Sequence, residues 1–150
     1  MKPYAVIFPL ALLVRYSVHA EDIFDEPVDV RATDPAILAY HTPDAEGILY
    51  RIVKGNPPTN ADMLSHHETG RLPKANPCLR CGLSVFRIIN DALNQQKLHP
   101  KLGNRIAKGS VSFADGKACQ TQGQQSTHTT WWPYEGVDRA AIFVVVKEVA

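Results

Sequence analysis

The sequence predicts one small domain of the α+β class, built from a mixed, mainly antiparallel sheet and two or three helices. Its 150 residues suit a single hydrophobic core. Apolar residues make up 45% of the chain and charged residues 21%, which is ordinary for a folded protein. Short strand patterns also outnumber helical repeats. The domain is expected to span residues 48–150, behind a leader at residues 1–20 and an acidic spacer at residues 21–47.

Five short segments carry the patterns of β-strands. Ile48–Val53 is a run of residues that favour strands, and the two prolines that follow end it because proline cannot continue a ladder. Over residues 107–113 small or apolar residues alternate with polar ones, which is typical of a strand with one wet face. The unbroken apolar run at residues 142–146 favours a central strand buried on both faces. The other two strands are expected at residues 82–86 and 127–132.

Two helices are expected between these strands. Thr59 is placed to cap a short helix with Asp62 in its first turn, and this helix should fade by Gly70. Apolar residues recur at helical spacing from Ile89 onward. The second helix is expected to end near Leu98, because a proline lies just beyond it.

The N-terminus has the order of residues that is typical of a secretory signal peptide. Lys2 precedes an apolar run at residues 5–14, and Val18-His19-Ala20 offers a cleavage site. The run is too short to span a bilayer, so no stable membrane anchor is expected. Pro9 and Arg15 favour the alternatives, an overextended start codon or a buried N-terminal segment. Export predicts a secreted or periplasmic protein.

Charge is divided unevenly along the chain. Residues 21–47 carry eight acids against one arginine, a balance of −7. Residues 48–150 carry 13 Lys and Arg against seven acids, a balance of +6. This domain could attract an anionic ligand, although a solvated surface partly neutralised by the spacer is the alternative. The basic residues are scattered and lack interleaved aromatics, so no nucleic-acid partner is expected.

Arg51 is the first candidate for binding a ligand. Alternation along the first strand places it on the same face as Leu49 and Val53, with Tyr50 and Ile52 on the other face. A guanidinium among apolar neighbours requires an anion or a polar partner. It could hold a phosphate or carboxylate of a ligand in a two-pronged contact. The alternatives are an internal pair with an acid and an extended side chain at a strand edge.

His128 is the second candidate. Strand alternation places it on the same face as Thr130 and Trp132, where it could line a cleft and accept a proton. A buried histidine bonded to the main chain is the alternative, and His66 and His67 are expected at the surface. The chain has no GxxxxGK[ST], GxGxxG, HExxH or GxSxG motif. Nucleotide hydrolysis, dinucleotide redox chemistry and serine hydrolysis therefore lack their usual sequence support.

Three cysteines allow three hypotheses. Cys78 and Cys81 form a CxxC motif, and Cys119 is a distant third thiol. A zinc site would need a fourth ligand such as His66, His67 or His128. A redox pair would lack a helix N-terminus, because residues 82–84 have an extended pattern. A structural disulfide is favoured by export, so we expect that no zinc is required and that two of the three thiols are oxidised in an exported chain.

Several motifs in order resemble a group of small uncharacterised bacterial proteins. The resemblance covers most of residues 49–149 and none of the leader, and the CxxC motif is not part of it. The resemblance to that group implies no particular activity for this chain. The motifs are Leu49-Tyr50-Arg51-Ile52-Val53, Asn56-Pro57-Pro58-Thr59, Gly82-Leu83-Ser84-Val85-Phe86, Pro100-Lys101-Leu102-Gly103, Ile106-Ala107 and His128-Thr129-Thr130-Trp131.

A second, looser resemblance is to ADP-ribosyltransferase-like domains. An early strand with Tyr50-Arg51, and a Gly-x-Ser strand that leads into a helix, resemble the opening of those domains. The resemblance implies that Arg51 and Ser84 help to hold NAD. It also implies a late catalytic glutamate or glutamine, but Glu135 and Glu148 are the only late glutamates and neither lies in a recognisable motif.

Two functions follow from these observations. The first is a small exported binding or interaction module for an anionic small molecule or a protein partner, without a cofactor or metal. The second is an ADP-ribosyltransferase-like enzyme that uses NAD. Arg51, Ser84 and His128 are the candidate ligand-binding residues, of which the second function concerns Arg51 and Ser84, and no catalytic residue is assigned.

Overall fold

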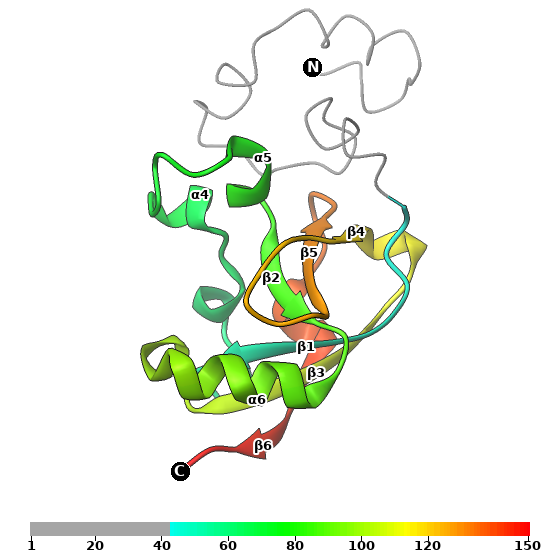
Figure 1. Ribbon diagram of the computed structural model, residues 1–150. Helices are drawn as coiled ribbons and strands as arrows, with labels where there is room; N and C mark the ends of the chain where they lie inside the picture. Colours follow the sequence, from blue (N-terminus) through cyan, green and yellow to red (C-terminus); the bar gives the residue numbers. More distant parts are fainter. Residues whose placement is uncertain (1–42) are drawn as a thin grey trace, which may run out of the picture.

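The computed structural model describes residues 43–150, so the leader and most of the spacer lie outside the described residues. It contains one six-stranded sheet in the order β4-β5-β2-β1-β3-β6, and each neighbouring pair is antiparallel (Figure 1). The α+β class is confirmed. The strands are β1 (Gly47–Val53), β2 (Leu83–Phe86), β3 (Arg105–Val111), β4 (Gly116–Gln120), β5 (His128–Pro133) and β6 (Phe143–Glu148).

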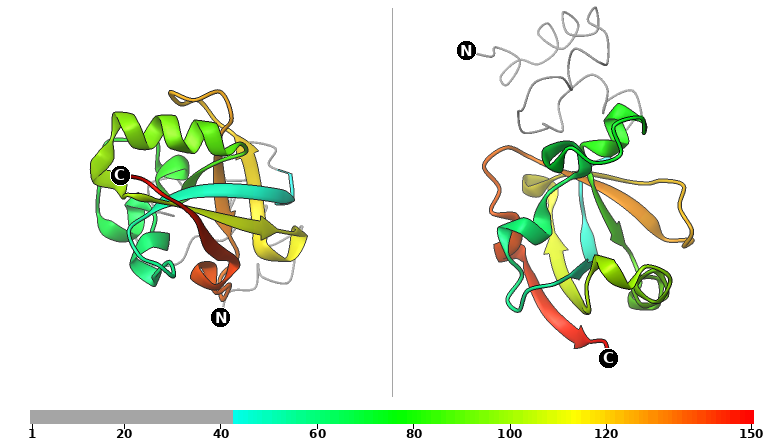
Figure 2. Two further views of the ribbon diagram at one scale, coloured as in Figure 1. Left: turned by 90° about the horizontal axis from the view of Figure 1, so that it is seen from below. Right: turned by 90° about the vertical axis from the view of Figure 1, so that its left-hand side faces the viewer.

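The helices are short, and within residues 43–150 only α6 is longer than four residues. None of the helices in this part of the chain is long and apolar enough to cross a bilayer. Figure 2 shows α6 on one side of the strands and η2 with α4 on the other. The helices are α4 (His66–Thr69), α5 (Pro77–Arg80), α6 (Ile89–Leu98) and α7 (Arg139–Ile142), and the 3₁₀ turns are η2 (Asn60–Met63), η3 (Pro100–Leu102) and η4 (Phe113–Asp115).

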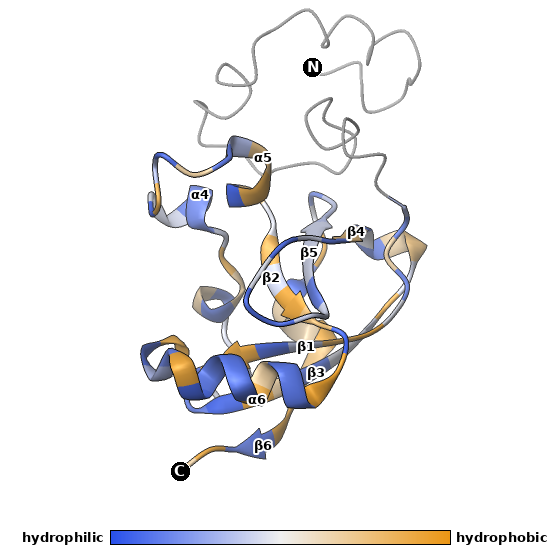
Figure 3. Cartoon of the chain, in the orientation of Figure 1, coloured by the Kyte–Doolittle hydropathy of each residue, from blue (hydrophilic) through white to orange (hydrophobic). Residues whose placement is uncertain are grey.

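The two faces of the sheet carry separate cores. We call the face that packs against η2 and α7 the first face, and the face that packs against α6 and α5 the second face. In Figure 3, much of β1 and β2 is orange, the colour of hydrophobic residues, whereas most of α6 is blue, the colour of hydrophilic ones. The first face buries Leu49, Val53, Met63, Leu83, Val85, Trp131 and Phe143. The second face buries Ile52, Phe86, Ala92 and Ile106 at one end, and Cys78, Cys81 and Trp132 at the other.

The last strand differs from the prediction. Residues 142–146 were expected in a central strand, but β6 is an edge strand that pairs only with β3. Phe143 is buried against Gly109, where an added Cβ would lie 2.8 Å from the Phe143 ring. Val144 is 60% exposed and Val146 is 44% exposed. An apolar run alone cannot distinguish a central strand from an edge strand that follows one buried anchor.

The fold begins inside the segment expected to be spacer. Ala45 is fully buried, and its amide donates to the carbonyl of Gly116 at 2.9 Å. Asp44 forms an ion pair with Lys117 on β4 at 2.7 Å. The last residues of the acidic segment therefore extend the β4 edge of the sheet.

The single helix expected over residues 59–70 is divided into η2 and α4. Thr59 and Asp62 form a capping box at the start of η2, and Ser65 and Glu68 form a second one at the start of α4. Each box satisfies amides at a helix start, so each turn has its own N-terminus. We call residues 59–69 the capped segment.

The carboxylate of Asp62 closes the turn after β1. It accepts from the amides of Lys54 at 2.8 Å, Gly55 at 3.1 Å and Thr59 at 2.9 Å. Burial raises the pKa of Asp62, but the hydrogen bonds from Thr59, Lys54 and Gly55 outweigh this effect and hold the pKa below its ordinary value of 3.8. The ionised form of Asp62 is therefore the one that stabilises the fold.

We predict that Asp62→Asn makes the unfolding free energy less sensitive to acid. A carboxyl with a lowered folded-state pKa stabilises the protein above its unfolded pKa, and this contribution is lost as the pH falls through the folded pKa. Urea unfolding between pH 7 and pH 2.5 should show a loss of about 1 kcal/mol for the variant at pH 7, allowing for solvent screening, and a shallower acid limb.

The matched control is Asp138→Asn. Asp138 caps α7 through one 3.4 Å bond to the amide of Ala141, and asparagine caps a helix as well as aspartate does. This variant should keep the acid limb of the wild type. Equal acid sensitivity of Asp62→Asn and wild type would contradict the prediction.

Candidate functional site

Ser84 and His128 meet on the second face of the sheet. In the β2–β5 register, Ser84 lies opposite Thr130 and Phe86 lies opposite His128. Ser84 and His128 are therefore diagonal neighbours on one face, a distance that such side chains can span. The Oγ of Ser84 lies 2.7 Å from the Nε2 of His128. Ser84 is exposed and His128 is half-buried.

The other side of the imidazole is fixed by Thr121. The Nδ1 of His128 lies 3.0 Å from the Oγ1 of Thr121 and 3.3 Å from its carbonyl oxygen. Thr121 Oγ1 also contacts the Oγ1 of Thr130 at 2.8 Å. Because a carbonyl can only accept, this contact favours the tautomer with its proton on Nδ1. Nε2 is then the acceptor for the hydroxyl of Ser84.

The loop at residues 121–127 is held against His128 by α6. The buried carboxylate of Asp91 accepts from the amide of Thr127 at 2.9 Å and from its hydroxyl at 2.5 Å. Gly123 packs directly on the ring, since an added Cβ there would lie 2.7 Å from the Cγ of His128. Phe86 contacts the ring edge-on with centroids 5.7 Å apart. The imidazole is therefore confined on several sides.

The electrostatics of His128 favour its neutral form. Burial lowers the pKa of His128 below its ordinary value of 6.5, and the hydrogen bond to Thr121 offsets this only in part. At neutral pH the ring is therefore an acceptor at Nε2 and carries no charge. The Ser84–His128 contact is a neutral hydrogen bond in which the hydroxyl donates.

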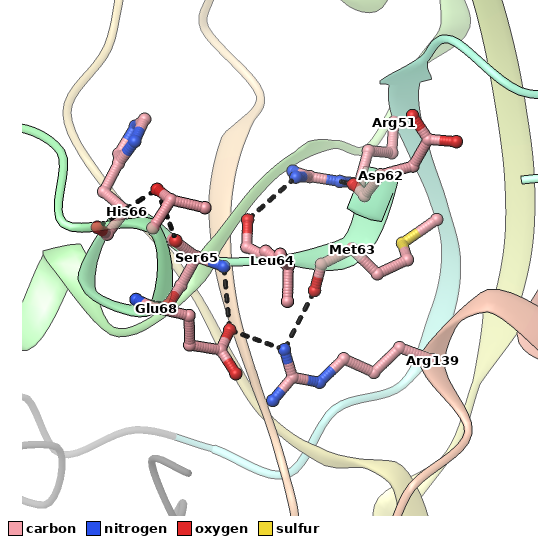
Figure 4. Close-up of polar contacts among 9 residues, drawn as sticks. Arg51, Asp62, Met63, Leu64, Ser65, His66, Glu68 and Arg139 are labelled. Atoms are coloured by element: carbon pink, nitrogen blue, oxygen red, sulfur yellow. Dashed lines mark hydrogen bonds and ion pairs between the residues drawn. The ribbon is translucent and has the colours of Figure 1, made fainter. Parts of the chain in front are cut away.

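Arg51 joins β1 to β2 and to the capped segment, and Figure 4 shows its contacts with the capped segment. Its Nε donates to the carbonyl of Asp62 at 2.8 Å, its Nη1 to the carbonyl of Ser84 at 2.8 Å, and its Nη2 to the carbonyl of Leu64 at 3.5 Å. The structure thus brings Arg51 to the main chain of Ser84 rather than to its hydroxyl. Direct ligand binding by Arg51 stays a prediction, and these three contacts favour a structural role.

The surroundings of Arg51 disfavour its charged form. The pKa of Arg51 is lowered to about 10, chiefly by burial and to a smaller extent by the positive charge of Arg139, while Asp62 and Glu68 oppose the shift. Arg139 itself donates to the carbonyl of Met63 at 2.9 Å and to Glu68 at 2.8 Å (Figure 4). Two arginines therefore hold carbonyls of the capped segment, Arg51 from strand β1 and Arg139 from helix α7.

Four basic residues gather near the start of β2, and we call them the basic cluster: Arg51, His66, Arg71 and Arg80. Burial lowers the pKa of His66, and the positive charges of Arg71, Arg51 and Arg80 lower it further. Arg80 donates through Nε to the carbonyl of Arg71 at 3.0 Å. Within residues 43–150, the guanidinium of Arg71 makes no hydrogen bond or ion pair. These residues come from β1, α4, the loop after α4, and α5.

The three cysteines lie in one apolar cluster around Trp132. Cys78 and Cys81 are buried, and Cys119 on β4 packs beside them half-buried. Burial raises the pKa of the Cys119 thiol. The CxxC motif forms α5, whose first amides are capped by Asn76, so the expectation that this motif lacks a helix N-terminus was wrong. No group of side chains suited to hold a metal ion occurs in residues 43–150.

No protein-family model, curated protein or solved structure was found to match the chain. The two resemblances drawn from the sequence therefore stay predictions. Sequence reasoning named Arg51, Ser84 and His128, which the structure links through adjacent strands. It missed Thr121, which lies in a loop without periodic pattern and so gave no signal. It also did not expect the basic cluster, because its residues are scattered in the sequence.

We predict that Arg51→Lys destabilises the fold. Lysine cannot reach three carbonyls with a planar fork, so at least one buried carbonyl loses its donor. Urea unfolding should show a loss of about 1–3 kcal/mol. Arg87→Lys is the control, because Arg87 makes one main-chain bond through its guanidinium, to the carbonyl of Glu46. Unchanged unfolding of Arg51→Lys together with loss of phosphate binding would show that Arg51 serves a ligand.

We also predict that two of the three cysteines are oxidised in an exported chain. Their shared apolar cluster brings all three thiol-bearing side chains together. Thiol titration of unfolded protein from an oxidising compartment should give one thiol per chain, whereas reduced protein should give three. Three titratable thiols from the oxidising compartment, or one tightly held zinc ion per chain, would contradict this expectation.

Proposed function

We propose that the protein is a small exported module that binds an anionic ligand at the basic cluster. The observation that carries the proposal is the pairing of Arg80 with the main chain of Arg71, through a 3.0 Å bond from Nε to the carbonyl, while the guanidinium of Arg71 has no partner within residues 43–150. The lowered pKa of His66, which is due first to burial and then to Arg71, Arg51 and Arg80, agrees with this gathering of positive charge. Like charges held together in a partly buried place repel one another, and a bound anion would relieve that repulsion. Phosphate or carboxylate groups are the matching ligand chemistry.

The acids near the cluster are already engaged. The carboxylate of Asp62 accepts from three main-chain amides, and Glu68 accepts from Arg139 and from the amide of Ser65. Arg71 and Arg80 form no ion pair with any residue in 43–150. Their guanidinium groups therefore have donors that a ligand could use in two-pronged contacts.

The wider charge of the domain supports the same proposal. Residues 48–150 carry a balance of +6, from 13 basic and seven acidic residues. A positive domain raises the local concentration of anions and their rate of encounter. Export to a secreted or periplasmic location is proposed from the order of residues in the leader.

The second candidate is an ADP-ribosyltransferase-like enzyme that uses NAD. The contact between Arg51 and Ser84 favours it, because the resemblance assigns these two residues to NAD. A late glutamate beside Ser84 is not supported. Glu148 accepts hydrogen bonds from Arg105 and Asn56 near the β6 edge, and the residue next to the Ser84 hydroxyl is His128. Binding of an anion is therefore proposed ahead of transfer chemistry.

We predict that the double variant Arg71→Gln/Arg80→Gln loses anion binding. Calorimetric titration of the full chain with inorganic phosphate, pyrophosphate and NAD should show wild-type binding that weakens with salt, and at least tenfold weaker binding in the variant, since each charged hydrogen bond contributes about 1.5–3 kcal/mol. Both side chains lie on short surface segments, so folding should be retained.

Lys97→Gln/Lys101→Gln is the matched control. It removes the same charge from exposed positions on α6 and η3, and its affinity should stay within about twofold of the wild type. An equal loss of affinity in both double variants would show that net charge, and not the basic cluster, determines anion binding. Absence of binding by the wild type would overturn the proposal, and release of nicotinamide from NAD would favour the second candidate.

A further inference from the structure

The hydroxyl of Ser84 is placed as a nucleophile would be. It is exposed on β2, and its only hydrogen-bond partner within residues 43–150 is His128. At 2.7 Å the Oγ–Nε2 distance is in the range over which a base can take a hydroxyl proton. The contact is formed on two adjacent strands of one sheet, so both side chains are carried by rigid elements.

The base is oriented by a third group. Thr121 contacts Nδ1 through its hydroxyl and its carbonyl, and this favours an Nε2 that is free of a proton and directed at Ser84. A nucleophile, a base within hydrogen-bond distance and a group that orients the base are the parts that activate a serine. Burial also keeps the pKa of His128 below its ordinary value, so the ring can accept a proton at neutral pH.

We propose that Ser84 and His128 form a nucleophile–base pair that cleaves small carboxylic esters. The Oγ of Ser84 attacks the ester carbonyl carbon while its proton passes to Nε2 of His128. The bond to the leaving oxygen then breaks, and the alcohol takes that proton from Nε2. Water attacks the acyl–Ser84 ester with His128 as base again, and release of the carboxylic acid restores the serine hydroxyl. Ester and water are converted to acid and alcohol.

Thr121 sets the rate that this pair can reach. It is a positioning residue, and a carbonyl with a hydroxyl stabilises an imidazolium less than a carboxylate does. Turnover should therefore be slow, because His128 is the base in both acylation and deacylation. Covalent labelling of Ser84 is for that reason a sharper readout than steady-state hydrolysis. This activity goes beyond the proposed binding function, because it uses none of Arg71, Arg80 or His66.

The test uses the folded full chain with two probes. A fluorophosphonate forms a bond from phosphorus to the serine oxygen with loss of fluoride, and mass spectrometry locates it. Release of p-nitrophenol from p-nitrophenyl acetate measures the acylation step. Label is expected on Ser84, and Ser84→Ala should lose both signals. His128→Gln should label at least about 100-fold more slowly.

Three further variants keep the result interpretable. Ser110→Ala removes an exposed serine from β3 and should label as the wild type does. Thr121→Val keeps the carbonyl and should slow labelling without moving it from Ser84. Arg71→Gln/Arg80→Gln should lose phosphate binding but keep the label, so the two proposals fail separately. Unlabelled Ser84 in a wild type that melts cooperatively, or equal labelling of Ser84 in His128→Gln, would overturn the inference.

Discussion

The guanidinium of Arg51 spans the place where the two halves of the sheet meet. Strands β4, β5 and β2 form one half, strands β1, β3 and β6 form the other, and β1 and β2 are in register only at Tyr50 and Phe86. Arg51 reaches from β1 to the carbonyl of Ser84 on β2, close to where the ladder stops. Its other two bonds draw the capped segment onto the same junction. A side chain thus supplies donors where the short β1–β2 ladder provides few main-chain bonds.

The short β1–β2 ladder also accounts for the polar contacts of Ser84. The short β1–β2 ladder leaves the first half of β2 free of a close strand partner on that side, and Ser84 is exposed there. Its carbonyl turns to Arg51 while its hydroxyl turns to His128. Positive charge from Arg51 then adds to that of Arg71 and Arg80 nearby. Where the ladder stops, the carbonyl of Ser84 therefore accepts from Arg51 of the basic cluster, while its hydroxyl contacts His128 on the second face.

Sequence patterns predicted the elements that depend on local chemistry. The strand at β1, the strand at β5 and the helix α6 agree with the structure to within a few residues, because alternation and helical spacing mark them directly. The edge position of β6 could not be predicted, since strand order is set by pairing and not by composition. The same holds for the site. The Ser84–His128 contact depends on register, and Thr121 depends on a loop that Asp91 anchors from a distant helix.

The edge strand β6 carries features that oppose pairing with another molecule. Val144 and Val146 lie beside an unpaired row of main-chain donors and acceptors, which is a template for adding a strand from another molecule. The strand departs from regular pairing where the register shifts between Ile106 and Ala107, and it ends in Lys147 and Glu148. An irregular ladder and two charges at the tip make intermolecular pairing unfavourable. Charged residues beside an exposed apolar strand are a general device against aggregation, and Lys147 and Glu148 flank the exposed valines in this way.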